Sequence, residues 1–322
     1  MANTDAYRNV RLALGDADSR FCRTVTAALF PLGLLDVSTC HSGTFMYEAA
    51  SATVDVVVCD THLPGLDFMA FVQDVRQGRV GGNPFTVIVA LVRDEGEAKS
   101  EGIPRSGIDE MLSKPINPLL LVRHINQLSR ERKSFVMTPG YVGPSRRDAR
   151  RNDGSDDNLV AVPNTLRAKV IDKKDQAEVA TMLGEGRSGL DKEKGLSGLR
   201  TVTRMVRQVM GLMDKNAPVD DTRAVLFALS RMAKQAAIQH HALSQEAGGT
   251  SHVPPILERI GQLAERSQRA ATGPTKLEVG LLLKLSEATF AIYAPRPGET
   301  NLDAAMAVPE IVAVVDGYLA KG

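Results

Sequence analysis

Two carboxylates and one ammonium group stand just after short apolar runs of the chain. Asp16, Asp60 and Lys114 each lie within two residues of the end of such a run. Where apolar runs form the parallel strands of one sheet, their carboxyl ends meet at one edge, and functional groups gather there. Carboxylate oxygens suit a hard cation such as Mg²⁺, an ammonium group neutralises phosphate oxygens, and a carboxylate can accept a group covalently. The three side chains therefore predict a site for phosphoryl chemistry.

Five apolar runs alternate with amphipathic segments before residue 131. The run from Val54 to Cys59 is β-branched and almost continuous, which is typical of a strand buried on both faces. Parallel strands need crossovers, and helices supply them, so the pattern predicts a doubly wound, five-stranded parallel α/β sheet. The expected strands are 10–14, 34–39, 54–59, 85–91 and 108–112, and the expected helices are 19–30, 42–50, 67–77, 95–101 and 118–129.

Residues 8–131 resemble the receiver domain of bacterial two-component response regulators. The resemblance rests on the acidic turn at Asp16, the segment VDVVVCDTHLPGLD around Asp60, and the pair Lys114-Pro115. It implies a flavodoxin-like sheet in which Asp60 is the phosphoacceptor and Lys114 contacts the phosphoryl group. It also implies that Asp16, Asp60 and the backbone carbonyl of His62 hold Mg²⁺.

Four positions depart from the family's pattern. Gly15 stands where the first of two adjacent acids is usual, and Phe68 stands where glycine is usual. Ala90 is aligned with the hydroxyl residue at the end of the fourth strand, and Met111 with the switch aromatic of the fifth. We therefore expect weak Mg²⁺ binding and a receiver that does not use the family's hydroxyl-to-aromatic relay.

The composition changes after the expected sheet. Residues 132–164 are rich in Gly, Pro, Ser, Asn and Asp without apolar periodicity, which predicts a flexible linker. In residues 165–322 apolar side chains recur at helical spacing, which predicts an all-α domain of five or six helices whose family the sequence does not identify. Pro309 is expected to start the last helix, and the glycine-rich segment 184–189 is expected to form a flexible turn.

The pair His240-His241 supports an alternative function. A helical bundle with an exposed histidine can be a phosphotransfer domain, so His241 could carry phosphoryl groups in a phosphorelay. Ser244 and Gln245 stand where that family has lysine and glycine, however. The simpler interpretation is a pair of exposed histidines that interact with the dipole of a helix end.

Charge and composition limit the choice of partners. Lys and Arg number 39 and Asp and Glu 38, so a net charge of +1 gives no global attraction to nucleic acid or anionic lipid. The stretch 130–151 holds seven Lys/Arg against two acids but no recognition-helix pattern, so the sequence favours a solvated linker over a nucleic-acid arm. Three cysteines without CxxC spacing give no metal motif.

The sequence also indicates a compartment and a class of partner. No apolar run reaches the ~18 residues that a membrane span needs, and the start of the chain lacks the order of a signal peptide, so we expect a cytoplasmic protein. We expect a signalling protein rather than an enzyme. Its expected partners are a histidine kinase or another signalling protein, or a second copy of the chain.

Overall fold

The computed structural model describes residues 6–98, 102–138, 140–146, 159–246, 252–293 and 301–320. The chain forms two compact units, residues 1–189 and 190–322. None of the helices in the described ranges is long and apolar enough to cross a membrane.

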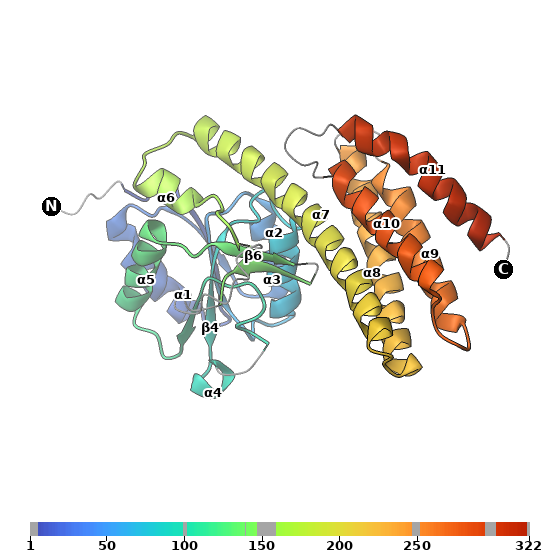
Figure 1. The fold of residues 1–322 in the computed structure, drawn as a ribbon. Helices are drawn as coiled ribbons and strands as arrows, with labels where there is room; N and C mark the ends of the chain where they lie inside the picture. Colours follow the sequence, from blue (N-terminus) through green and yellow to red (C-terminus); the bar gives the residue numbers. More distant parts are fainter. Residues whose placement is uncertain are drawn as a thin grey trace. The chain divides into compact units, whose positions relative to one another are not determined.

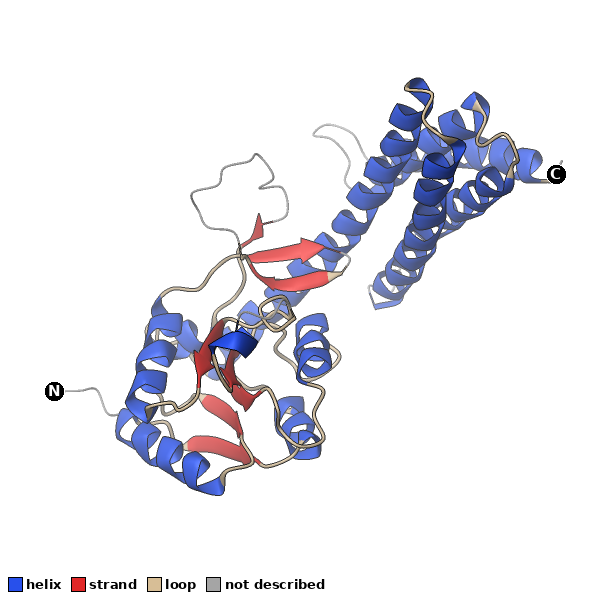
Figure 2. Ribbon diagram, turned by 90° about the horizontal axis from the view of Figure 1, so that it is seen from below, coloured by secondary structure: helices blue, strands red, loops and turns tan. Residues whose placement is uncertain are grey.

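A five-stranded parallel sheet with the strand order β2-β1-β3-β4-β5 forms the centre of the first unit (Figure 2). This order is the flavodoxin-like one, so the predicted fold class is confirmed. Every strand ends one residue later than the sequence predicts and begins one or two residues later. The first residues of the apolar runs, such as Val10 and Ile108, are buried in the core but precede the first paired residue of the strand. The strands are β1 Arg11–Gly15, β2 Asp36–Cys40, β3 Val56–Asp60, β4 Val87–Val92 and β5 Glu110–Ser113.

Helices cover both faces of this sheet, and side chains alternate between the two faces along each strand. Val56 and Val58 of β3 belong to a core that also takes side chains from α1 and α5, whereas Val57 and Cys59 belong to a core with α2 and α3 (Figure 1). Crossover helices on both faces explain why β3 and β4 read as continuous apolar runs. The helices are α1 Ser19–Leu29, α2 Gly43–Ser51, α3 Phe68–Gln77, α4 Glu95–Ala98 and α5 Pro118–Arg130, with a 3₁₀ turn at Phe30–Leu32.

The predicted flexible linker over 132–164 is wrong for half of its described residues, which form strands. Strands β6 Phe135–Thr138, β7 Tyr141–Pro144 and β8 Leu159–Val160 form a second, antiparallel sheet with the order β7-β6-β8. Phe135 and Met137 are fully buried. These strands are two to four residues long and include Gly and Pro, so they leave almost no alternating pattern in the sequence. Residues 147–158 of the predicted linker lie outside the described residues.

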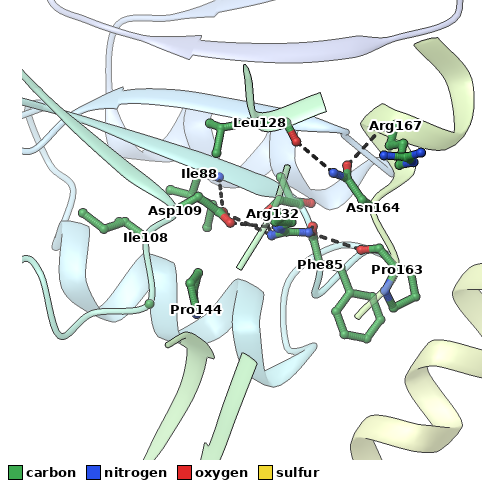
Figure 3. Close-up of polar contacts among 12 residues, drawn as sticks. Phe85, Ile88, Ile108, Asp109, Leu128, Arg132, Pro144, Pro163, Asn164 and Arg167 are labelled. Carbon is green, nitrogen blue, oxygen red and sulfur yellow. Dashed lines mark hydrogen bonds and ion pairs between the residues drawn. The ribbon is translucent and has the colours of Figure 1, made fainter. Parts of the chain in front are cut away.

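A buried ionic network fixes this small sheet to the large one (Figure 3). The Asp109 carboxylate accepts hydrogen bonds from Arg132 Nε (2.8 Å), Arg76 Nη2 (2.8 Å) and the Ile88 backbone N–H (2.9 Å). The ring of Phe135 lies 5.1 Å from the Arg76 guanidinium and 4.8 Å from that of Arg132. Burial raises the pKa of Asp109, but the two arginines together outweigh burial and hold the pKa below its ordinary value, so the carboxylate stays charged.

The first unit also extends past residue 165, where the sequence places the start of the second domain. Helix α6, Thr165–Val170, is capped by Asn164 and buries Leu166 in the core beside α1 and α5. Helix α7 begins at Gln176 and runs to Asp214, so the predicted turn at 184–189 is wrong. A Cβ on Gly186 would lie 2.3 Å from Pro163 Cγ, so glycine at this position allows α7 to approach Pro163 closely.

The second unit is all-helical, with one core built from α7, α8, α9, α10 and α11. Pro309 lies inside α11 rather than at its start, because the alanine-rich segment before it already forms helix. The helices after α7 are α8 Val219–Glu246, α9 Val253–Arg269, α10 Lys276–Tyr293 and α11 Asn301–Leu319.

Candidate functional site

The three side chains that the sequence singles out meet at the carboxyl edge of the large sheet. Asp16 directly follows β1, Asp60 is the last residue of β3, and Lys114 directly follows β5. The Lys114 Nζ lies 2.6 Å from Asp16 Oδ2 and 2.5 Å from Asp60 Oδ2. The predicted convergence of two carboxylates and one ammonium group is therefore confirmed.

Backbone amides orient the two carboxylates. Asp16 Oδ1 accepts a hydrogen bond from the Asp18 N–H, and Asp60 Oδ1 accepts one from the His62 N–H, both at 2.8 Å. The Asp16 side chain is 3% exposed and that of Asp60 is 15% exposed. Asp60 is therefore the carboxylate that a reactant from solvent reaches more easily.

The lysine keeps its charge in this setting. Burial lowers the pKa of Lys114, but its hydrogen bonds to Asp16 and Asp60 outweigh burial and raise the pKa above the ordinary lysine value. The group is therefore an ammonium ion at neutral pH. It neutralises part of the charge of the two carboxylates and can do the same for an incoming phosphoryl group.

The donor set fits a weakly held Mg²⁺ ion. Among the described residues, no group of three or more His, Cys, Asp or Glu side chains could hold a metal ion. Magnesium needs fewer protein ligands, because it commonly takes one or two carboxylates together with waters and phosphate oxygens. Asp16 and Asp60 supply that pair, and the Lys114 ammonium competes for the same oxygens. The His62 imidazole contacts Thr61 and Glu97 instead.

Gly15, which stands where an acid is usual in the family, lies against neighbouring side chains. A Cβ on Gly15 would lie 2.4 Å from Met46 Cε and 3.0 Å from Cys59 Sγ. An aspartate side chain at this position would need its neighbours to move. Phe68, at the position where glycine is usual, begins α3 and packs in the core.

The sequence pattern suggests that Ala90 stands at the end of the fourth strand, but the structure does not place it there. Strand β4 ends at Val92, while Ala90 lies two residues earlier, level with Cys59 of β3. Leu91 lies level with Asp60, and both Leu91 and Val92 are fully buried and carry no hydroxyl. The expected consequence is unchanged, because none of these side chains can donate a hydrogen bond to a phosphoryl group. Met111 lies beside Ala90 in the register of β4 and β5.

A carboxylate that the sequence reasoning missed lies beside Asp60. Thr61 Oγ1 donates to Glu97 Oε1 (2.7 Å), and Glu97 Oε2 accepts from the Arg93 N–H (2.8 Å). Glu97 therefore holds the loop after β4 against the loop after β3. The sequence signal for this contact was Asp94 followed three residues later by Glu97, a spacing that indicates the start of a helix. In the structure, Asp94 Oδ1 accepts a hydrogen bond from the Glu97 N–H (2.9 Å).

Cys59, which precedes Asp60, and His240, the first histidine of the pair, are both buried. Cys59 is buried in the core, and burial raises its pKa, so it is the core residue that the sequence predicts. His240 is 2% exposed, which corrects the prediction of two exposed histidines. Its ring packs edge-on against Tyr293 (4.6 Å), and burial lowers its pKa. His241 is exposed, five residues before the end of α8.

Strand order and site together define a receiver-type α/β fold in the first unit. No family model matches the chain, and no curated protein matches it. Among solved structures, the chain is similar to the chemotaxis response regulator CheY4 of Vibrio cholerae, with 25% identity and a TM-score of 0.33, covering 37% of this chain and 98% of that one. It is also similar to the response regulator DrrB of Thermotoga maritima, with 24% identity and a TM-score of 0.33, covering 39% of this chain and 55% of that one. A third is the receiver domain of the Arabidopsis thaliana histidine kinase CKI1 complexed with Mg²⁺ and BeF₃⁻, with 20% identity and a TM-score of 0.33, covering 39% of this chain and 95% of that one.

Proposed function

We propose that the chain is an atypical response regulator of the cytoplasm, in which Asp60 accepts a phosphoryl group and the helical unit engages a protein partner. The observation that supports this most directly is the Lys114 ammonium between Asp16 and Asp60. In an open α/β sheet, the carboxyl edge is where ligands bind. The expected donor is a phosphohistidine of a histidine kinase, or a small acyl phosphate.

The proposed reaction is an in-line transfer to one carboxylate oxygen of Asp60. The oxygen attacks phosphorus, a new P–O bond forms, and the donor's P–N or acyl P–O bond breaks. The leaving group keeps the electron pair, and an imidazole leaving group takes up a proton. Lys114 exchanges its contact with Asp60 for a phosphoryl oxygen and so neutralises charge on the transferred group.

Asp16, Asp60 and the backbone carbonyl of His62 would hold Mg²⁺ during this step. When bound, the ion supplies positive charge between the carboxylates and the phosphoryl oxygens. Because only two carboxylates are present, we expect the metal to bind weakly without a phosphoryl group.

The output is expected to depend little on phosphorylation. A modification shifts a conformational equilibrium only through contacts that differ between the two states. Leu91, Val92 and Met111 provide neither the hydroxyl nor the aromatic ring on which such contacts would depend. We therefore expect a partner to bind the unmodified and the phosphorylated chain with affinities that differ by less than tenfold.

Labelling with a small acyl phosphate in the presence of Mg²⁺ tests the proposal. We expect base-labile label on Asp60 that is lost in Asp60→Asn and kept in Asp18→Asn. Asp18 is a matched control because it is a neighbouring carboxylate, and asparagine can keep its cap on α1. Label that persists in Asp60→Asn, or that maps to His241, would contradict the assignment and favour the phosphorelay.

A further inference from the structure

A polar cleft of about 440 Å³ lies at the edge of the large sheet opposite to Asp60. One wall comes from the residues at the start of β1 and β2, which are the amino ends of these parallel strands. The other wall comes from the end of α6, the loop that contains Lys174 and the first two turns of α7, all in the first unit. The length of a strand, roughly 15 Å for five residues, separates this cleft from the phosphoryl site.

Positive charge is concentrated in this cleft. Its lining contains four cationic side chains and one carboxylate, that of Asp36, although the whole chain carries a net charge of only +1. Lys169 is engaged by the buried carboxylate of Asp55 (2.7 Å). Arg11 forms an ion pair with Asp36 (3.2 Å) in which both side chains are about half exposed, so the pair is weak.

Arg8 and Lys174 are the two cations that remain. Neither side chain has a hydrogen bond or an ion pair among the described residues. Their backbones are nevertheless held in place. Lys174 donates its N–H to Ala168 O (2.9 Å), and Arg8 lies in the turn closed by the hydrogen bond from the Val10 N–H to Tyr7 O (3.0 Å). Two cations in one cleft, neither with a partner among the described residues, are both available to an anion that binds there.

The chemistry of the walls indicates the class of ligand. A concave site with an excess of one sign of charge raises the local concentration of oppositely charged small molecules. Arg and Lys together suit phosphate oxygens, which take both forked and single hydrogen bonds. Asn9, Thr53 and Gln176 add neutral hydrogen-bonding groups, and Val179 and Leu183 add an apolar surface. The volume lies within the range of small-molecule sites.

We propose that this cleft binds a small molecule that carries two or more phosphate charges, of the size of a nucleotide. The ligand would contact the amino edge of the sheet and the first turns of α7 at once. It would therefore act on the helix that continues into the second unit, without using Asp60. The chain would then have two independent inputs, a covalent one at the carboxyl edge and a ligand at the amino edge.

Calorimetric titration of the full chain with ATP, inorganic pyrophosphate and adenosine tests this proposal. We expect saturable binding of ATP and pyrophosphate, which weakens as salt rises, and no binding of adenosine. The double variant Arg8→Gln/Lys174→Gln should bind both phosphates at least tenfold more weakly. The variant Asp60→Asn should bind them as the wild type does, which separates this site from the proposed receiver function.

The matched control is Arg207→Gln/Lys215→Gln, which removes the same charge from exposed positions of the second unit. It should bind ATP and pyrophosphate like the wild type. Equal weakening in both double variants would reveal nonspecific attraction and overturn the proposal. The absence of saturable binding to both phosphates in the wild type would also overturn it.

Discussion

Replacing Asp109 by asparagine tests whether the small sheet is an integral part of the first unit. The substitution leaves Arg76 and Arg132 without their counter-ion, although their side chains are only 1% and 4% exposed. Removing one partner of a buried ion pair costs about 3–5 kcal/mol, because the remaining charge stays buried. The amide oxygen that replaces the carboxylate in Asp109→Asn can still accept a hydrogen bond, so we expect the lower end of this range.

Hydrogen–deuterium exchange of the β4 amides measures this cost in the first unit alone. A loss of about 3 kcal/mol corresponds to exchange that is roughly 100-fold faster, since each 1.4 kcal/mol is tenfold. The control is Asp172→Asn, which breaks the exposed Arg167–Asp172 pair (3.5 Å) and should change the exchange by less than about fivefold. Equal effects of the two variants would refute the reasoning that the buried network stabilises the unit.

The pH dependence of stability follows from the same carboxylate. Burial raises the folded-state pKa of Asp109, but the arginines outweigh burial and hold this pKa below the ordinary value of 3.8. The contribution of Asp109 to stability is therefore complete above pH 3.8 and is lost as the pH falls through the lower, folded-state pKa. Asp109→Asn should lack this part of the acid destabilisation, so wild type and variant should become more alike in acid.

Three further predictions concern the site and α7. Glu97→Ala should speed amide exchange in residues 93–97 at least tenfold, because it removes two hydrogen bonds to a charged group, whereas Glu110→Ala should leave this loop unchanged. We expect Mg²⁺ to cause small changes in the NMR chemical shifts of the amides near β1. Asp16→Asn should abolish these changes and Asp18→Asn should not; the opposite result would mean that Asp18 is the ligand. Gly186→Ala should speed exchange in the first turns of α7, because its Cβ would overlap Pro163, whereas Gly184→Ala, which meets no atom within 4 Å, should slow it.

The sequence predicts the large sheet and its site well because both follow from local patterns. The run 54–59 has the composition of a buried strand, and parallel strands bring their carboxyl ends together, so Asp16, Asp60 and Lys114 meet. Ala90 illustrates the limit of this reasoning. In an unbroken apolar run, the last strand residue is set by pairing with β5, which the sequence does not show.

The small sheet was missed because its stability comes from distant contacts. Arg132 and Phe135 look like linker residues until Asp109 and Arg76 are placed beside them. Likewise, Gly186 reads as a turn residue unless Pro163 is known to pack against it. His240 was predicted to be exposed because a histidine gives no sign of the face of the helix on which it lies. In each case, tertiary packing overrides the local preference of the residue.

A crystal structure of the full chain with Mg²⁺ and BeF₃⁻ tests the central claim most directly. The account predicts beryllium attached to one carboxylate oxygen of Asp60, Mg²⁺ between Asp16 and Asp60, and the Lys114 ammonium against a fluorine instead of Asp60. Beryllium fluoride bound at another residue would contradict the account. So would a site in which Lys114 keeps its contacts with both carboxylates and no beryllium fluoride binds at saturating concentration.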